Sequence, residues 1–127
     1  MILLRQGKSK LAKESFENAI LLNYTNKQLS RLYAKSLLQN NDKKNAILKL
    51  TELTLTEPKD IILLTELSKA YISIENYSKA IEKINKVIFL NNNYSNAYFI
   101  RSQIKSLQGD DKKALEDITR ALRIENN

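Results

Sequence analysis

Residues 96–122 of this 127-residue chain read NAYFIRSQIKSLQGDDKKALEDITRAL, and they show the helical pattern of the chain most clearly. A Gln-Gly pair at 108–109 divides it, because glycine tolerates the left-handed conformation that closes a helix. Small and apolar residues then recur at spacings of four, three and one: Ala114, Ile118, Ala121 and Leu122. Such spacing places them on one face of a helix. The stretch therefore predicts two consecutive helices joined by a tight turn.

The same columns of residues return along the chain every 34 positions. The alanine column contains Ala12, Ala46, Ala80 and Ala114. The columns that follow it are Phe16, Leu50, Ile84 and Ile118; Ala19, Leu53, Val87 and Ala121; and Ile20, Thr54, Ile88 and Leu122. The columns that precede it are Leu29, Leu63 and Ala97; Ala34, Ser68 and Ser102; and Leu37, Tyr71 and Lys105. Each unit therefore contains two helices, neither of which can bury its apolar face alone.

Turn and cap residues set the expected helix limits. Pairs suited to closing a helix stand in the middle of each unit: Gln6-Gly7, Asn40-Asn41, Glu75-Asn76 and Gln108-Gly109. N-cap acceptors precede the second helices and the first helices: Asp42, Asn76 and Asp110, then Asn26, Asp60 and Ser95. The pattern predicts eight helices, at residues 1–6, 9–22, 27–39, 43–56, 60–74, 78–90, 95–107 and 111–124.

With these residues the chain resembles an array of tetratricopeptide repeats (TPR), a family with a 34-residue helix–turn–helix unit. The resemblance implies an all-α, right-handed α-solenoid of antiparallel helix pairs. It covers the whole chain as one domain, 1–127, with a partial repeat at 1–26 and full repeats at 27–60, 61–94 and 95–127. No Trp opens any unit, and Pro58 is the only inter-unit proline, which departs from the family pattern.

Small side chains are expected where the helices cross, because helix axes approach within about 8–10 Å only over short side chains. The crossing residues would be the spaced alanines with Ala34, Ser68 and Ser102. Both ends of the array lack a polar capping helix, although solenoids normally need one. The chain is then a segment of a larger protein, or its ends pair with another copy or are covered by a partner; we favour the first.

The composition argues against enzymatic chemistry. The chain has no Cys and no His, so it lacks thiol chemistry, the commonest general base and the commonest metal ligand. Asp110-Asp111 more simply begins a helix, and Glu116-Asp117 is expected to face away from the packed side of its helix. We therefore predict no catalytic activity, no metal and no cofactor. The sequence also predicts no membrane span, and without a secretory signal on this segment the cytoplasm is the default compartment.

The net charge of +7 raises the question of a polyanionic partner. Residues 1–60 carry 11 basic and 6 acidic residues, and residues 61–127 carry 10 and 8. Lys outnumbers Arg by 16 to 5, and no aromatic ladder accompanies the charges. Salt-sensitive, nonspecific attraction to polyanions is the expectation, without specific nucleic-acid recognition.

The TPR resemblance implies that the first helix of each unit lines a concave groove for a peptide or helix of another protein. The residues expected to bind the partner in this groove are Gln28, Arg31, Lys35, Gln39, Ile62, Glu66, Lys69, Asn96, Phe99 and Gln103. The repeat alignment adds Leu32, Thr65, Ser73, Ile100 and Ser106 to the groove. Arg31, Lys35 and Lys69 would form a basic strip, with Ile62 and Phe99 as apolar anchors. Taken singly, each of these residues is better explained as solvated surface, whereas the set as a whole is better explained as a groove. The alternative function is self-association into homo-oligomers through the uncapped ends.

Some TPR domains grip the terminal carboxylate of a chaperone peptide with a clamp of Lys, Asn and Arg residues. The corresponding positions here read Arg31 and Lys35, then Glu66, then Asn96 and Ile100. Glu66 places a repelling carboxylate in the clamp, and the last pair supplies no cation. The sequence therefore predicts that this clamp is absent.

Overall fold

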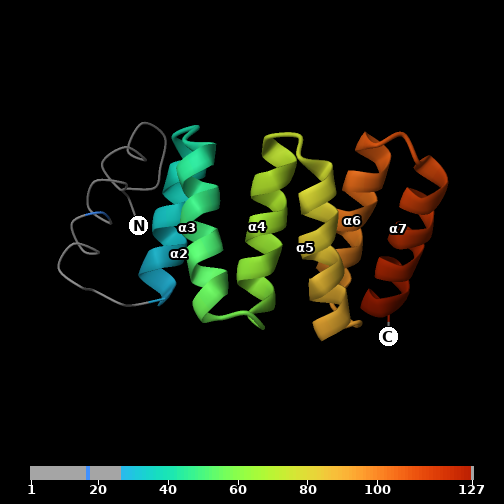
Figure 1. Cartoon of the computed structure of the whole chain (residues 1–127). Helices are drawn as coiled ribbons and strands as arrows, with labels where there is room; N and C mark the ends of the chain where they lie inside the picture. Colours follow the sequence, from blue (N-terminus) through green and yellow to red (C-terminus); the bar gives the residue numbers. More distant parts are fainter. Residues whose placement is uncertain (1–16, 18–26, 127) are drawn as a thin grey trace. The chain divides into compact units, whose positions relative to one another are not determined.

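The computed structural model describes residue 17 and residues 27–126, and within these residues the protein is all-α, without strands (Figure 1). The described helices are α2 (Lys27–Gln39), α3 (Lys43–Thr56), α4 (Ile61–Ser73), α5 (Tyr77–Leu90), α6 (Ser95–Leu107) and α7 (Asp111–Glu125). These limits agree with the six corresponding predictions to within one residue. The helices predicted at 1–6 and 9–22 lie outside the described residues, apart from Glu17, which is helical.

The chain divides into two compact units, residues 1–58 and 59–127. In the first unit α2 packs against α3, and Ala34 and Ala46 are fully buried. In the second unit α4 packs against α5, α5 against α6 and α6 against α7, while α4 also contacts α6 directly. Within each unit, consecutive helices thus form antiparallel hairpins, as the alternation of helix and tight turn requires.

The core of the second unit lies where α4, α5 and α6 meet. Its buried members are Leu64, Ala80, Ile84, Val87, Ala97, Ile100 and Ile104. The predicted role of small residues is confirmed between α4 and α5, where the Ser68 hydroxyl donates a 2.8 Å hydrogen bond to the carbonyl oxygen of Ala80. Both residues are fully buried. A larger side chain at either position would hold the two helices apart.

The three turns inside the repeats share one geometry. Asn41, Glu75 and Gly109, spaced 34 residues apart, all have a positive φ, of 62°, 61° and 84°. In each turn the next residue donates its backbone N–H to a carbonyl five residues earlier, as in the Schellman motif that ends a helix. Asn and Gly were expected to take this conformation. In the middle repeat, however, Glu75 takes it rather than Asn76, because the position that needs a positive φ is fixed by the 34-residue spacing.

The N-cap predictions hold at three of the described positions and are wrong at two. The side chains of Asp60, Asn76 and Asp110 each accept a backbone N–H from the following turn. Asp42 stands at its N-cap position without a side-chain capping bond, and its carboxylate instead accepts from the Asn45 side chain. Ser95 is the first residue of α6 rather than its cap, since Tyr94 has the extended backbone of the N-cap position. The predicted cap Asn26 lies outside the described residues.

Candidate functional site

In the first unit, the predicted site residues all lie on α2. Lys35 and Gln39 are exposed and four residues apart, so they share a face of the helix, and Arg31 is half-buried one turn earlier. Gln28 belongs to α2, but its side chain lies outside the described residues. The basic strip that would join Arg31 and Lys35 to Lys69 spans both units and stays a prediction.

In the second unit, six predicted residues define a surface that we call the α4–α6 face. It consists of Ile62, Glu66 and Lys69 on α4 and Asn96, Phe99 and Gln103 on α6. Within each helix the residues are spaced by three or four, so each set lies on one side. Because α4 and α6 contact each other, the two sets belong to neighbouring helices. All six side chains retain exposure to solvent.

The chemistry of the α4–α6 face is mixed. Ile62 is 45% exposed, which leaves an apolar side chain accessible between polar neighbours. Lys69 forms an ion pair with Glu66 at 3.7 Å, so part of its positive charge is already compensated. Asn96 and Gln103 supply amide groups, each with both donors and an acceptor. The arrangement suits a ligand that combines apolar contacts with neutral hydrogen bonds.

Two residues expected in the groove are part of the core instead. Thr65 is 2% exposed, and its hydroxyl donates to the carbonyl oxygen of Ile61 within its own helix. Ile100 is 5% exposed and packs in the core of the second unit. Both lie on the edge of the predicted face that turns toward the neighbouring helix, so alignment alone did not separate them from the accessible positions.

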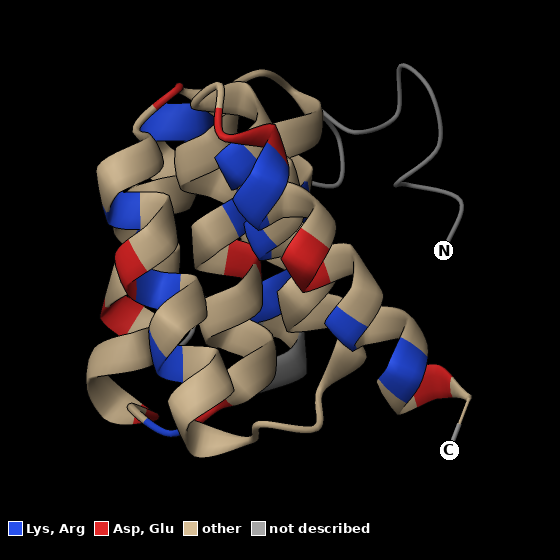
Figure 2. Ribbon diagram, turned by 90° about the vertical axis from the view of Figure 1, so that its right-hand side faces the viewer, with Lys and Arg blue, Asp and Glu red and all other residues tan. Residues whose placement is uncertain are grey.

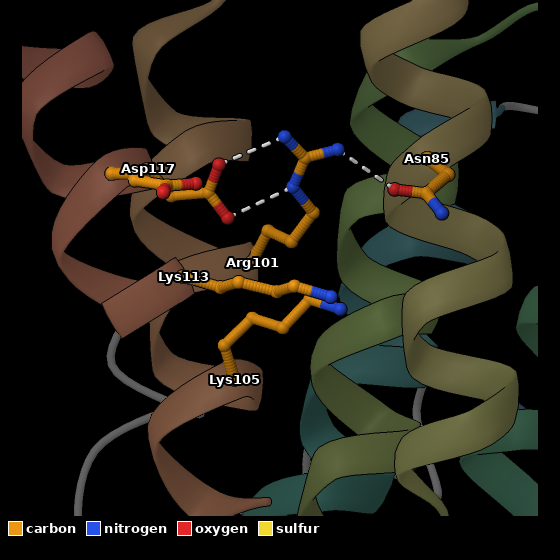
Figure 3. A pocket seen from close by; sticks show the side chains of 6 residues that line it. Asn85, Arg101, Lys105, Lys113 and Asp117 are labelled. Atoms are coloured by element: carbon orange, nitrogen blue, oxygen red, sulfur yellow. Dashed lines mark hydrogen bonds and ion pairs between the residues drawn. The ribbon is translucent and has the colours of Figure 1, made fainter. Parts of the chain in front are cut away.

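Sequence reasoning missed the strongest polar contact of the second unit, which joins α5, α6 and α7 (Figure 3). The Arg101 guanidinium donates to both carboxylate oxygens of Asp117, at 2.9 Å and 2.8 Å, and to the side-chain oxygen of Asn85 at 3.0 Å. Asp117 is 7% exposed, so the expectation that it faces away from the packed side of α7 is wrong. Hydrogen bonding to Asp117 raises the pKa of Arg101 above its ordinary value, although burial acts in the opposite direction.

Two positions at which the last repeat differs from the preceding repeat could have revealed this contact. Arg101 occupies the column of Leu67, and Asp117 occupies that of Lys83. Leu67 is fully buried, so a charged residue in the next unit at the same column needs a partner of opposite sign. Asp117 lies three residues after Ala114 on α7, close to the packed side of that helix, and provides the partner.

Arginine side chains also cover an aromatic ring next to this contact. The guanidinium groups of Arg101 and Arg120 lie 5.5 Å and 5.8 Å from the centre of the Tyr98 ring, within the range of cation–π attraction. The Tyr98 hydroxyl donates to the carbonyl oxygen of Asn92 at 2.9 Å. These contacts attach α7 and the loop before α6 to one buried ring.

Helix α7 presents two large apolar side chains to solvent. Leu115 is 64% exposed and Leu122 is 48% exposed. The residues 34 positions earlier, Ile81 and Ile88, are partly buried and pack against the core of the unit. At these two repeat positions the isoleucines of α5 are therefore packed against the core, whereas the leucines of α7 are exposed to solvent in the described part of the chain.

The described helices carry charged residues of both signs. Figure 2 shows Lys and Arg interspersed with Asp and Glu along the helices. Among residues 17 and 27–126, no group of three or more acidic, Cys or His side chains is placed to hold a metal ion. No helix in the same residues combines the length and the apolar character that crossing a bilayer needs.

The comparisons with known proteins agree with the helical pattern. Residues 95–127, which contain α6 and α7, match the tetratricopeptide repeat family. A search of curated proteins gave no match. This region is therefore a TPR, and solved structures extend the likeness to nearly the whole chain.

Those structures have low sequence identity and the same fold. The chain is similar to MamA 41-end from Desulfovibrio magneticus RS-1, with a TM-score of 0.86 and 22% identity over 94% of this chain and 68% of that one. It is similar to YrrB, titled a TPR protein with an unusual peptide-binding site, with a TM-score of 0.83 and 18% identity over 94% and 61%. It is also similar to the second TPR of Spaghetti (RPAP3) bound to the HSP90 peptide SRMEEVD, with a TM-score of 0.69 and 19% identity over 89% and 97%. The protein thus has the all-α, helical-solenoid fold of TPR proteins.

Proposed function

We propose that the chain is a protein–protein interaction scaffold whose first-helix faces bind a peptide or helix of a partner protein. The observation that carries the proposal is the α4–α6 face, where two contacting helices hold accessible side chains of mixed chemistry around Ile62 and Phe99. An apolar anchor surrounded by polar groups is the usual composition of a peptide-binding surface. On α2, where the 34-residue spacing repeats, we propose the same role for Gln28, Arg31, Lys35 and Gln39.

The structural relatives support a peptide or protein ligand. YrrB is described as having an unusual peptide-binding site, and the second TPR of Spaghetti (RPAP3) is bound to an HSP90 peptide. TPR modules generally act by binding rather than catalysis, and the absence of catalytic activity is part of our proposal. The clamp for a terminal carboxylate is not part of it, because Glu66 and the buried Ile100 occupy two of its positions.

Site-specific photo-crosslinking tests the proposal and identifies the partner at the same time. A photoreactive p-benzoylphenylalanine replaces Ile62 or Gln103 on the α4–α6 face, or Lys86 on α5 as a control; all three side chains are exposed. In native lysate we expect positions 62 and 103 to crosslink to the same protein and position 86 not to do so. Equal crosslinking at all three positions would argue against a specific surface.

A second candidate function is self-association, and the exposed leucines of α7 favour it. Leu115 and Leu122 lie seven residues apart on one side of the helix, in the column that α6 covers on α5. Pairing with a second copy would bury this side. Sedimentation equilibrium of the parent and of Leu115→Lys with Leu122→Glu separates the candidates, because only self-association predicts a parent dimer that the double substitution dissociates.

A further inference from the structure

A second polar site lies on the other side of α6. Its pocket, of about 210 Å³, lies between α5 and α7 above α6 and is lined by Asn85, Arg101, Lys105, Lys113, Glu116 and Asp117. Arg101 and Lys105 are four residues apart and share one side of α6. Gln103 of the α4–α6 face stands two residues from each of them, a rotation of about 200°. The pocket and the α4–α6 face are therefore on opposite sides of the same helix.

Two lysine side chains line this pocket (Figure 3). Lys105 extends from α6 and Lys113 from α7, and in this view both side chains are directed toward α5. Lys105 is half-buried, and its ammonium group makes no hydrogen bond or ion pair with the described residues. Lys113 has only a long contact, 3.9 Å, with the carboxylate of Asp110. Two cations that line one pocket repel each other, so an anion bound between them would lower the electrostatic energy of both.

The Arg101 and Asp117 side chains of the pocket already have hydrogen-bond partners within the protein. Asp117 and the Arg101 guanidinium satisfy each other through two hydrogen bonds, and Asn85 accepts the third. The fork formed by Nε and Nη2 of Arg101 is therefore occupied by Asp117 and does not bind phosphate through two parallel hydrogen bonds. The side chains that line the pocket carry one net positive charge, because Arg101, Lys105 and Lys113 are opposed by Glu116 and Asp117. This charge favours a monoanion, although the Asp110 carboxylate beside Lys113 reduces it.

We propose that this pocket binds a single carboxylate group of an acidic peptide segment, held by the ammonium groups of Lys105 and Lys113. The volume supports a group of this size, because pockets for drug-sized ligands occupy about 300–1,000 Å³. The carboxylate comes from an Asp or Glu side chain or from a chain terminus, and both sources share the same chemistry. Glu116 at the rim disfavours a doubly charged phosphate by repulsion.

Titrations of the full chain followed by NMR test the proposal. The first probe is a capped tetrapeptide with one Glu, acetyl-Ala-Glu-Ala-Ala-amide, and its Gln counterpart is the control. A second probe, acetyl-Ala-Ala-Ala-Ala with a free terminal carboxylate, distinguishes the two sources. We expect the Glu peptide or the free-terminus peptide to shift the signals of Asn85, Lys105 and Lys113, and the Gln peptide to leave them unchanged. No shift with either carboxylate probe at concentrations of tens of millimolar would overturn the proposal.

Matched substitutions locate the binding groups. Lys105→Gln should weaken binding about tenfold, because its half-buried ammonium gives the stronger charge-assisted hydrogen bond. Lys113→Gln should weaken it about threefold, because an exposed pair contributes less. Lys112→Gln changes the net charge equally at the neighbouring exposed position, which does not line the pocket, and should leave binding unchanged. An equal loss in all three variants would reduce the effect to net charge and overturn the assignment.

Two further comparisons complete the NMR experiment: a titration with inorganic phosphate, and the identity of the residues whose signals shift. Inorganic phosphate binding more tightly than the Glu peptide would replace the carboxylate assignment with a phosphate site and so overturn it. The test is independent of the proposed peptide surface, because ligands there would shift the signals of Ile62, Phe99 and Gln103 instead. Failure of one site therefore leaves the other unaffected.

Discussion

The contact between Arg101 and Asp117 leads to the most specific prediction about stability. The same columns of the preceding repeat hold Leu67 and Lys83, and Lys83 forms an ion pair with Glu82 at 3.5 Å. Substituting Arg101→Leu together with Asp117→Lys would reproduce that arrangement in the last repeat, with Glu116 as the new partner of the lysine. We expect the double variant to lie within about 1 kcal/mol of the parent in its free energy of unfolding.

Each single substitution should be much more costly. Arg101→Leu leaves the Asp117 carboxylate, whose side chain is 10% exposed, without its two charge-assisted hydrogen bonds. Asp117→Lys places a second cation beside a guanidinium whose side chain is 25% exposed. Complete removal of one partner from a fully buried pair costs about 3–5 kcal/mol, and the partial exposure of Arg101 reduces this to about 2–3 kcal/mol for each variant. The coupling energy between the two positions should therefore exceed about 2 kcal/mol.

Urea denaturation followed by circular dichroism at 222 nm measures these differences. With a slope of about 2 kcal/mol per molar urea, each single variant should lower the midpoint by about 1 M, and the double variant by less than half of that. Amide exchange of α6 and α7 provides a local readout, because repeat proteins need not unfold in one step. If the two single effects simply add in the double variant, the contact does not hold these helices as described.

The remaining predictions concern the backbone and the helix crossings. Glu75→Gly should raise the free energy of unfolding by about 0.5–1 kcal/mol, because glycine adopts the positive φ of this position without strain. Gly109→Ala should lower it by about 1 kcal/mol because of the positive φ and not because of a steric clash, since a Cβ there meets no atom within 4 Å. The urea midpoint should therefore rise in the first variant and fall in the second. Asp60→Ala should cost about 1–2 kcal/mol, because its carboxylate accepts from two backbone N–H groups, and Asp42→Ala less than half as much, because Asp42 makes no capping bond; equal losses would contradict the assignment of the caps. Ala80→Leu should cost about 1–3 kcal/mol by separating α4 from α5, which a thermal melt would show as a lower midpoint.

Much of the architecture was predictable because it depends on features that repeat. The alanine column and the turn pairs fix where helices begin and end, and the described helices agree with those limits to within one residue. The position that needs a positive φ also repeats, which explains why Glu75 takes a conformation that its own side chain does not favour. Spacing therefore outweighed local preference at this turn.

The surface was less predictable, because a column assigns a side of a helix but not the depth of a side chain. Thr65 and Ile100 share the predicted side with Glu66 and Phe99, yet both are buried. Whether a residue at the edge of a face is accessible depends on the neighbouring helix and on the size of its side chains. The prediction that Asp117 faces away from the packed side was wrong for the same reason, because its burial depends on its contact with Arg101 on another helix.

The departure of one repeat from the pattern is the feature that distinguishes its chemistry. The buried leucine of the preceding unit becomes Arg101, and this change requires Asp117 and engages Asn85, so three helices share one polar contact. That contact uses three of the five N–H groups of Arg101. It leaves the Lys105 ammonium group, one turn further along α6, directed toward α5 without a hydrogen-bond or ion-pair partner among the described residues. If the last repeat kept the leucine of the preceding repeat at position 101, this part of α6 would be apolar. The exchange of a packing residue for a charged one thus creates a cationic pocket on one side of α6, while the side that carries Phe99 and Gln103 keeps the composition expected for binding a peptide.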